Sequence, residues 1–185
     1  TGSAEIEVPM MRKQGRVLYE SFPSLQFEVI ALRYTAAVYM EIFLPYRTQS
    51  LKNLTDHLRF IHMADFGIHA KYTPVDYKIP RMKFNWKKSL VEVLNLKEIF
   101  SDLDQSQMTP KPVKISDMFH ATEIEVDERG TTASAVTSIK TIPRSANGPI
   151  ENPIPFYVDR PFFINIVHLP SCSYLFSGLV YQPIQ

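Results

Sequence analysis

Residues 156–166 read Phe-Tyr-Val-Asp-Arg-Pro-Phe-Phe-Ile-Asn-Ile and carry the strongest fold signal in the chain. The chain is close to continuously apolar from residue 161, inside this stretch, to residue 167, just after it. Such a run is typical of a β-strand that is covered on both faces. Similar apolar runs flank it at 154–158 and 174–181. We therefore expect the last quarter of the chain to consist of strands.

Working outward, the preceding sequence predicts further strands and only two short helices. Three runs rich in β-branched and aromatic residues, at 16–22, 27–34 and 38–44, predict an antiparallel meander. Helical spacing of leucines predicts helices over 52–62 and 89–100, and strands are expected over 76–86 and 113–127. Two helices are too few to cover so many apolar strands, so we expect the chain to be one piece of a larger domain.

Composition excludes several functional classes. The 185 residues hold 20 Lys and Arg against 19 Asp and Glu, so a strongly basic nucleic-acid-binding domain is not expected. The one cysteine, Cys172, cannot form an internal disulfide, and no apolar run reaches 18 residues, so no membrane span is expected. The first residues lack a signal-peptide pattern.

Catalytic and metal-site patterns are also missing. The five histidines show no pair at helical i, i+3 or i, i+4 spacing, and the chain has neither a Gly-x-Ser-x-Gly elbow nor a glycine-rich phosphate loop. We expect no metal site and no enzymatic activity.

The segment from 128 to 145 has an unusual composition. Residues 131–139 contain no charge, no proline and no large ring, and Pro143 and Arg144 follow them. A flexible linker is one interpretation. However, only one glycine, Gly130, lies in this stretch, and its Thr and Val residues are compatible with a β-strand. The segment could therefore enter a sheet.

Several separated blocks of the sequence resemble the serpins, a family of serine protease inhibitors and non-inhibitory relatives. The blocks are Val-Pro-Met-Met at 8–11, Tyr-Lys-Ile-Pro-Arg-Met-Lys at 77–83, Ile-Ser-Asp-Met-Phe-His-Ala at 115–121, Glu-Val-Asp-Glu-Arg-Gly-Thr at 125–131, the stretch at 156–166, and Phe-Ser-Gly-Leu-Val-Tyr-Gln-Pro at 176–183. The resemblance implies an α+β serpin fold: a multi-sheet, β-rich C-terminal half with few helices and an exposed reactive-centre loop. Residues 1–185 would form the C-terminal portion of one domain, with hinge and loop over 128–153.

The resemblance implies a suicide-substrate inhibitor, in which a protease attacks the loop and the loop then inserts into the main sheet. The family spacing starts the hinge at Glu128 and makes Arg144-Ser145 the reactive bond, with Pro143 supporting specificity. Inserted hinge residues that face the core must be small, and alternation from Thr131 selects Thr131, Ala133, Ala135 and Thr137. Gly130 would act as a pivot.

An arginine at the reactive bond implies a trypsin-like target, and Pro143 suits thrombin-like proteases. Lys140 is the competing reactive residue, in a register four residues away. Two positions depart from the family pattern, because Arg129 and Thr132 stand where many inhibitory serpins carry acidic residues. The alternative function is a non-inhibitory serpin-fold binding or carrier protein, which usually has bulky or charged hinge residues.

The remaining expectations concern single residues and partners. His120 resembles the family's shutter histidine, and the sequon at Asn53 predicts N-glycosylation and favours a secreted, extracellular protein. The cations Arg81, Lys83, Lys87 and Lys88 are expected to be a solvated face, with a glycosaminoglycan site as the alternative. We expect no bound cofactor; glycosaminoglycan activation stays open. The expected partners are a trypsin-like protease and the N-terminal half of the same serpin.

Overall fold

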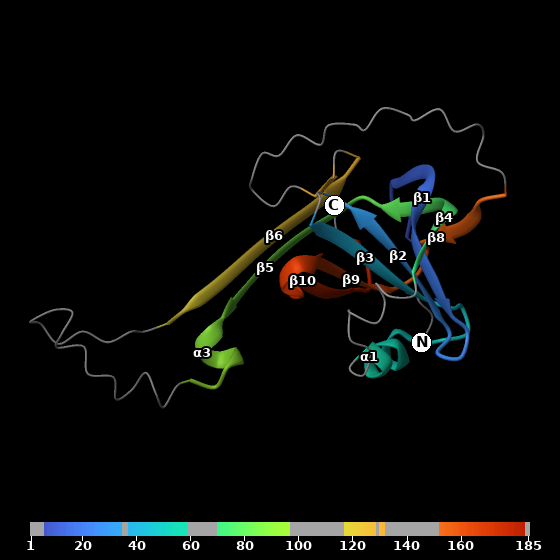
Figure 1. Ribbon diagram of the computed structural model, residues 1–185. Coiled ribbons are helices and arrows are strands. Elements are labelled where there is room, and N and C mark those ends of the chain that lie inside the picture. Colours follow the sequence, from blue (N-terminus) through green and yellow to red (C-terminus); the bar gives the residue numbers. More distant parts are fainter. Residues whose placement is uncertain are drawn as a thin grey trace, which may run out of the picture.

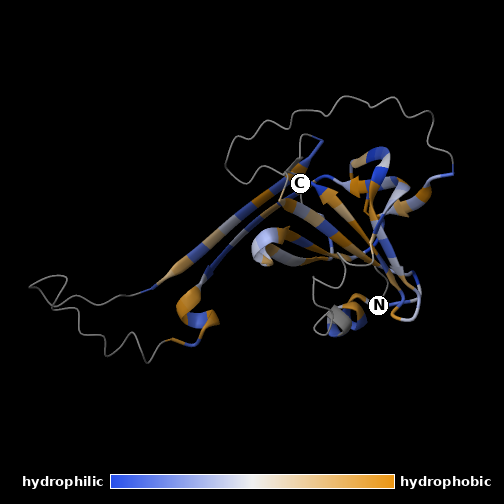
Figure 2. Cartoon of the chain, in the orientation of Figure 1, coloured by the Kyte–Doolittle hydropathy of each residue, from blue (hydrophilic) through white to orange (hydrophobic). Residues whose placement is uncertain are grey.

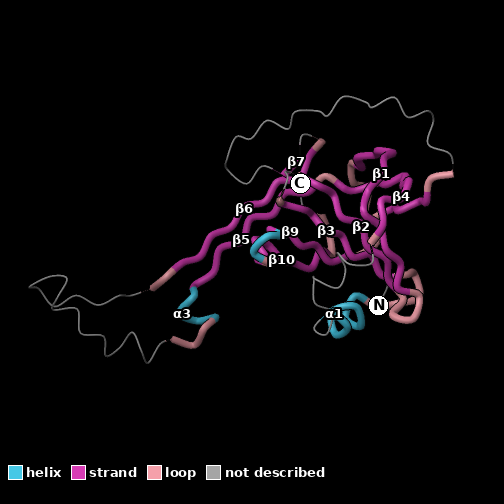
Figure 3. The backbone as a smooth tube through the Cα atoms, in the orientation of Figure 1, coloured by secondary structure: helices cyan, strands magenta, loops and turns pink. Residues whose placement is uncertain are grey.

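The protein is described from a computed structural model that covers residues 6–34, 37–58, 70–96, 117–128, 130–131 and 152–183. In chain order its elements are β1 (Met10–Phe22), β2 (Phe27–Arg33), β3 (Val38–Pro45), α1 (Leu51–Leu58), β4 (Lys71–Pro80), β5 (Met82–Ser89), α3 (Leu90–Val93), β6 (Phe119–Asp127), β7 (Gly130–Thr131), β8 (Ile154–Tyr157), β9 (Phe162–His168), the short 3-10 helix η1 (Leu169–Ser171) and β10 (Ser173–Val180). Strands therefore dominate the described chain, as Figure 3 shows.

Seven strands form one sheet in the order β10-β9-β3-β2-β1-β4-β8. All neighbouring pairs in this sheet are antiparallel except β4 and β8, which are parallel. A second sheet, β5-β6-β7, extends from the first as a long arm with α3 at its far end (Figure 1). The expected meander is confirmed as β1, β2 and β3, and β1 begins earlier than predicted, at Met10.

The strand predicted over 76–86 is wrong as a single element. The structure divides this region into β4 and β5, which belong to different sheets and are separated by Arg81 alone. Pro80, the last residue of β4, has no backbone N–H to continue the ladder, so the change of sheet falls at a position where pairing is already weakened.

Two other boundaries differ from the predictions, and the predicted end of the first helix lies outside the described residues. The described part of the second helix is only Leu90–Val93, because Leu94 and Asn95 form a turn and Asn95 has a positive φ of 54°. The strand predicted from 113 begins at Phe119, after residues 117 and 118, which are not in a strand. The first helix ends at Leu58 in the described residues, and 59–62 lie outside them.

The seven-stranded sheet has an apolar cluster on each face. One cluster includes Ile30, Ile42, Val75 and Phe156, and the other is built around Phe27, Phe43 and Leu54 of α1. Strand β9 is largely buried, as its apolar sequence predicted, whereas β10 is exposed over much of its length. Figure 2 shows hydrophobic residues along the central strands and also on α3 and the arm.

One acid lies inside this apolar sheet. Glu41 on β3 is 2% exposed and lies between Ala31 of β2 and Asn165 of β9 in the register. Burial raises the pKa of Glu41 to about 8, although a hydrogen bond with Asn165 lowers the pKa in part. The carboxyl group is therefore mainly protonated in the folded protein at neutral pH.

Glu41 makes the folded state less stable as the pH rises. Its carboxyl ionises near pH 4.5 in the unfolded chain but near pH 8 in the fold, so the stabilisation present below pH 4.5 is lost as the pH approaches 8. At about 1.4 kcal/mol per pKa unit, the upper limit is a few kcal/mol. We expect Glu41→Gln to raise the thermal midpoint at pH 8 more than at pH 5.

The matched control is Glu92→Gln, which changes an exposed glutamate on α3. The pH dependence of its midpoint should follow the wild type. Parallel curves for Glu41→Gln and the wild type would contradict a buried, protonated Glu41.

Candidate functional site: the two anchors of the 128–153 segment

The structure describes both ends of the segment predicted to be the hinge and reactive loop. At the first end, β6 finishes at Asp127 and the chain turns back to form β7, pairing Gly130 with Asp127 and Thr131 with Val126. Six predicted site residues lie outside the described residues: Ala133, Ala135, Thr137, Pro143, Arg144 and Ser145. What the structure adds is how the segment is attached.

The first anchor is an ion pair between Arg81 and Glu128. The Arg81 Nε donates to Glu128 Oε1 at 2.9 Å, and the Arg81 Nη2 also contacts this oxygen. This pairing lowers the pKa of Glu128 and raises that of Arg81. The Arg81 backbone N–H donates to the Pro9 carbonyl at 3.0 Å. The predicted hinge start is thus bound to the residue that joins the two sheets.

The second anchor is β8, the edge strand that follows the segment. It pairs in parallel with β4, and beyond it the Val158 N–H donates to the Lys78 carbonyl at 2.9 Å. The Tyr157 hydroxyl donates to Asp76 Oδ2 at 3.2 Å, and the Lys78 Nζ lies 4.6 Å from the centroid of the Tyr157 ring. Side chains therefore reinforce a strand of only four residues.

Asp76 is itself held by Arg12 of β1. The two residues form a bidentate pair, with Nε to Oδ1 at 2.9 Å and Nη2 to Oδ2 at 2.6 Å. The Asp76 side chain is 7% exposed, and the hydrogen bonds from Arg12 lower its pKa to about 2. One carboxylate thus links three neighbouring strands, β1, β4 and β8.

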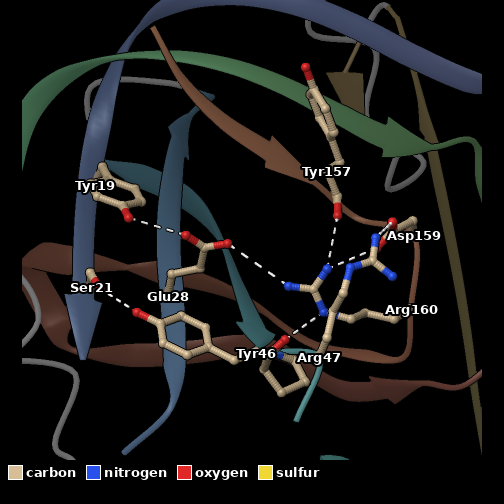
Figure 4. A network of polar contacts seen from close by, with 9 residues as sticks. Tyr19, Ser21, Glu28, Tyr46, Arg47, Tyr157, Asp159 and Arg160 are labelled. Carbon is tan, nitrogen blue, oxygen red and sulfur yellow. Dashed lines mark hydrogen bonds and ion pairs between the residues drawn. The ribbon is translucent and has the colours of Figure 1, made fainter. Parts of the chain in front are cut away.

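A second polar network fixes the turn between β8 and β9 (Figure 4). The Arg160 Nε donates to the Pro45 carbonyl at 2.5 Å, its Nη1 donates to Asp159 Oδ1 at 2.8 Å, and its Nη2 lies 4.0 Å from Glu28 Oε1. Asp159 also pairs with Arg47. These contacts tie the turn to β2 and to the end of β3.

Tyr19 completes this network from β1. Its hydroxyl donates to Glu28 Oε2 at 3.1 Å, and the nearby Ser21 and Tyr46 hydroxyls are 2.7 Å apart. Burial raises the pKa of Glu28, and it raises the pKa of Tyr19 to about 12. The partly buried Glu28 thus accepts a hydrogen bond from Tyr19 and forms an ion pair with Arg160.

His120 lies on the β5–β6 arm and is exposed. Its Nε2 is 3.0 Å from Thr122 Oγ1, and its ring contacts Trp86 edge-on, with 5.7 Å between the centroids. These residues line an open groove between the arm and β9–β10 that also includes Ile166 and Phe176. The shutter role of His120 stays a prediction.

The predicted basic cluster on the arm is partly neutralised. Lys83 Nζ lies 3.0 Å from Glu123 and 3.7 Å from Glu125, and Arg81 is paired with Glu128. This arrangement favours the interpretation as a solvated face. Whether a glycosaminoglycan activates the protein stays untested.

The sequon asparagine is positioned on the surface. Asn53 of α1 is exposed, its Nδ2 donates to Gln49 Oε1 at 2.7 Å, and the neighbouring Leu54 is fully buried. In the described residues no helix is long and apolar enough to cross a membrane. Those residues also contain no group of three or more His, Cys, Asp or Glu side chains arranged to hold a metal ion.

Comparison with known proteins identifies the family. The family model described as "Serpin (serine protease inhibitor)" matches residues 1–183. The chain belongs to the serpin family. This serpin chain is 31% identical to Iripin-2 of Ixodes ricinus over 184 residues, covering 97% of the chain and 46% of that protein. It is 28% identical to heparin cofactor 2 of Oryctolagus cuniculus over 185 residues, covering 97% of the chain and 37% of that protein. It thus spans less than half the length of both relatives.

Solved structures agree with the serpin fold expected from the sequence. The chain superimposes on a serpin from the trematode Schistosoma haematobium with a TM-score of 0.78 at 21% identity, covering 97% of this chain and 48% of the other. For the structure titled "Cleaved Serpin 42Da" the TM-score is 0.71 at 27% identity, with the same coverage. A thyroxine-binding globulin in complex with thyroxine gives 0.74 at 20% identity, covering 96% and 47%.

Sequence reasoning missed the residues that anchor β8. Asp76 contacts Arg12, which is 64 positions away in the sequence, and Tyr157, which is 81 positions away. No local sequence pattern connects residues at such distances. One available signal was Asp76 itself, a charged residue next to Val75 in a strand that had to be largely buried. An acid at such a position requires a partner.

Removing the Asp76 charge should weaken the β8 anchor. We expect Asp76→Asn to lower the thermal midpoint by several degrees at pH 7, because the Arg12 pair is lost, and Tyr157→Phe to lower it less, because one hydrogen bond is removed. Since the pKa of Asp76 is lowered, its stabilisation is lost as the pH falls toward 2. Wild type and Asp76→Asn should therefore converge near pH 2.

Asp56→Asn on α1 is the matched control, because Asp56 is exposed. It should leave the midpoint unchanged. A deficit of Asp76→Asn that persists undiminished at pH 2 would contradict this assignment.

Proposed function

We propose that the protein is a secreted suicide-substrate inhibitor of a trypsin-like serine protease. The observation that carries the proposal is the sequence of the anchored segment. A run of uncharged residues at 131–139 begins three positions after Glu128, and Arg144 follows at the family spacing. The membership in the serpin family and the two anchors of this segment support the proposal.

The proposed reaction begins as ordinary proteolysis. The protease serine Oγ attacks the Arg144 carbonyl carbon, the bond to the Ser145 nitrogen breaks, and the protonated amine leaves with the C-terminal fragment. Arg144 remains attached to the protease as an ester. Insertion of the hinge into the main sheet then carries the protease away before water hydrolyses the ester.

The specificity follows from the charge of Arg144. A guanidinium in the specificity pocket requires a carboxylate at its base, as in trypsin-like proteases. Insertion gains backbone pairing and places Thr131, Ala133, Ala135 and Thr137 toward the core, where small side chains avoid collisions. The form before cleavage would persist for kinetic reasons.

A second candidate is a non-inhibitory carrier. Thyroxine-binding globulin, whose structure is similar to that of this chain, was solved in complex with thyroxine. The absence of bulky or charged residues from 131 to 139 favours the inhibitor.

Incubating the complete protein with trypsin tests the proposal. We expect a complex that survives SDS, because the ester is covalent, and we expect Arg144→Ala to abolish it. Lys140→Ala is the matched control and should leave the complex intact. Cleavage without any complex would support the carrier, and loss of the complex in Lys140→Ala alone would move the reactive bond to Lys140.

The hinge has a separate test. Thr131→Arg places a large cation at the first inserted position, so insertion should slow and trypsin should cleave the protein as a substrate. The measured quantity is the ratio of complex to cleaved protein. An unchanged ratio would contradict the proposed insertion register.

The sequon at Asn53 supports the proposed secretion. We expect the protein produced by a secreting eukaryotic cell to lose mass on treatment with an endoglycosidase, and Asn53→Gln to lack that shift. Gln49→Ala removes the hydrogen bond to Asn53 but keeps the sequon, so it should retain the shift. A wild type that shows no shift would remove this support.

A further inference from the structure

An exposed face next to β8 carries positive charge. Strands β1 and β4 present Arg12, Arg16 and Lys78 on the same side as Tyr157, because the register pairs Arg12 with Lys78, Lys78 with Tyr157, and Arg16 with Pro74. The opposite side of these strands holds Val17, Val75 and Ile79, which belong to the core. We call Arg12, Arg16 and Lys78 the cationic face.

The charge of the cationic face is not balanced. Asp76, the acid next to Arg12 and Lys78, is 7% exposed and is occupied by Arg12 and Tyr157. Arg16 is exposed and Lys78 is half-buried, and among the described residues no carboxylate forms a salt bridge with either. Arg16 and Lys78 therefore carry charges that no described carboxylate neutralises.

The placement of the cations also has a cost for the sheet. Arg12 and Lys78 are direct cross-strand partners, and like charges in that position are destabilising. Asp76 compensates Arg12, and the Tyr157 ring accepts Lys78 as a cation–π partner. An acidic partner that binds to the cationic face would offset the repulsion that remains between Arg12 and Lys78.

The cationic face lies within reach of a protease on the proposed loop. Nine residues, 145–153, separate Arg144 from the first residue of β8. Such a segment spans at most roughly 35 Å even when fully extended. A domain of about 200 residues has a radius of gyration of roughly 16 Å, so a protease at Arg144 can contact the face beside β8.

We propose that the cationic face docks an acidic surface of the target protease, next to the part of its cleft that binds residues after the reactive bond. This inference rests on the proposed function and specifies the partner further. Its effect is on association, because exposed charges at the rim of an interface mainly change the association rate and its salt dependence. Salt screens the attraction between exposed charges over about 8 Å at physiological ionic strength, so the acidic surface of the protease must come close to the cationic face.

A sulfated polysaccharide is the competing occupant. The protease is favoured because the face adjoins β8, which continues directly from the proposed loop, and because it has only two uncompensated cations. Counterion release from a polyanion grows with the number of cations engaged, so two would bind such a chain weakly.

The test compares an anionic and a cationic trypsin, which share the preference for arginine but differ in surface charge. The second-order rate constant of inhibition is measured with the complete protein and with the double variant Arg16→Glu, Lys78→Glu. We expect the wild type to react faster with the anionic enzyme, and the double variant to lose about tenfold with that enzyme at physiological salt. The loss should shrink at high salt.

Control variants distinguish an effect of charge from an effect on folding. Arg12 is left unchanged because it holds Asp76, and the conservative variant Arg16→Lys, Lys78→Arg should restore the wild-type rate. Lys52→Glu removes an exposed cation on α1, which Figure 1 shows apart from β8, and should have no effect. Because Lys78 also contacts the Tyr157 ring of β8, the single variant Arg16→Glu is measured as well; it leaves that contact intact and should lose rate with an unchanged stoichiometry of inhibition.

The outcomes separate this inference from the proposed function. If the wild type forms no complex with either trypsin, the proposed function itself fails. If complexes form but the double variant reacts at the wild-type rate with both enzymes, the docking face is wrong. A loss of rate that occurs only in the presence of added heparin would likewise overturn protease docking and assign the face to a sulfated polysaccharide.

Discussion

The change of sheet at Arg81 is the constraint on which the rest of the structure depends. Strands β4 and β5 are separated by this residue alone, yet β4 lies in the seven-stranded sheet and β5 in the arm. Each strand then holds one end of the 128–153 segment, because β5 pairs with β6 and β4 pairs with β8. The two ends of this 26-residue segment are therefore held by two strands that meet at Arg81.

This topology explains where the polar interactions lie. Backbone pairing on one side holds β8, an edge strand of four residues, and that pairing alone is a weak attachment. The Asp76 carboxylate, the Tyr157 hydroxyl and the Arg160 network add contacts at this edge, where water is largely excluded from Asp76. Because Asp76 is buried, its contacts contribute more to stability than the more exposed ion pairs of Lys83.

Several features of the fold followed from local pattern. The apolar run at 161–167 predicted β9, and the three runs at 16–44 predicted β1, β2 and β3. These predictions were possible because the hydrophobic pattern of a strand can be recognised from a few consecutive residues. The end of β6 at Asp127 was also predicted correctly. The division of 76–86 was not, since strands in two different sheets have the same local preferences on either side of Arg81.

By itself, the sequence determined the serpin family, the strand-rich fold and the composition of the proposed hinge, because each is carried by residue types at fixed spacing along the chain. Only the tertiary structure decided that Glu128 meets Arg81, that Asp76 joins Arg12 to Tyr157, and that Arg16 and Lys78 share one exposed face. Those contacts connect residues 47, 64 and 81 positions apart. Their existence depends on strand order and register, which are selected by burial on both faces of the sheet rather than by any local pattern.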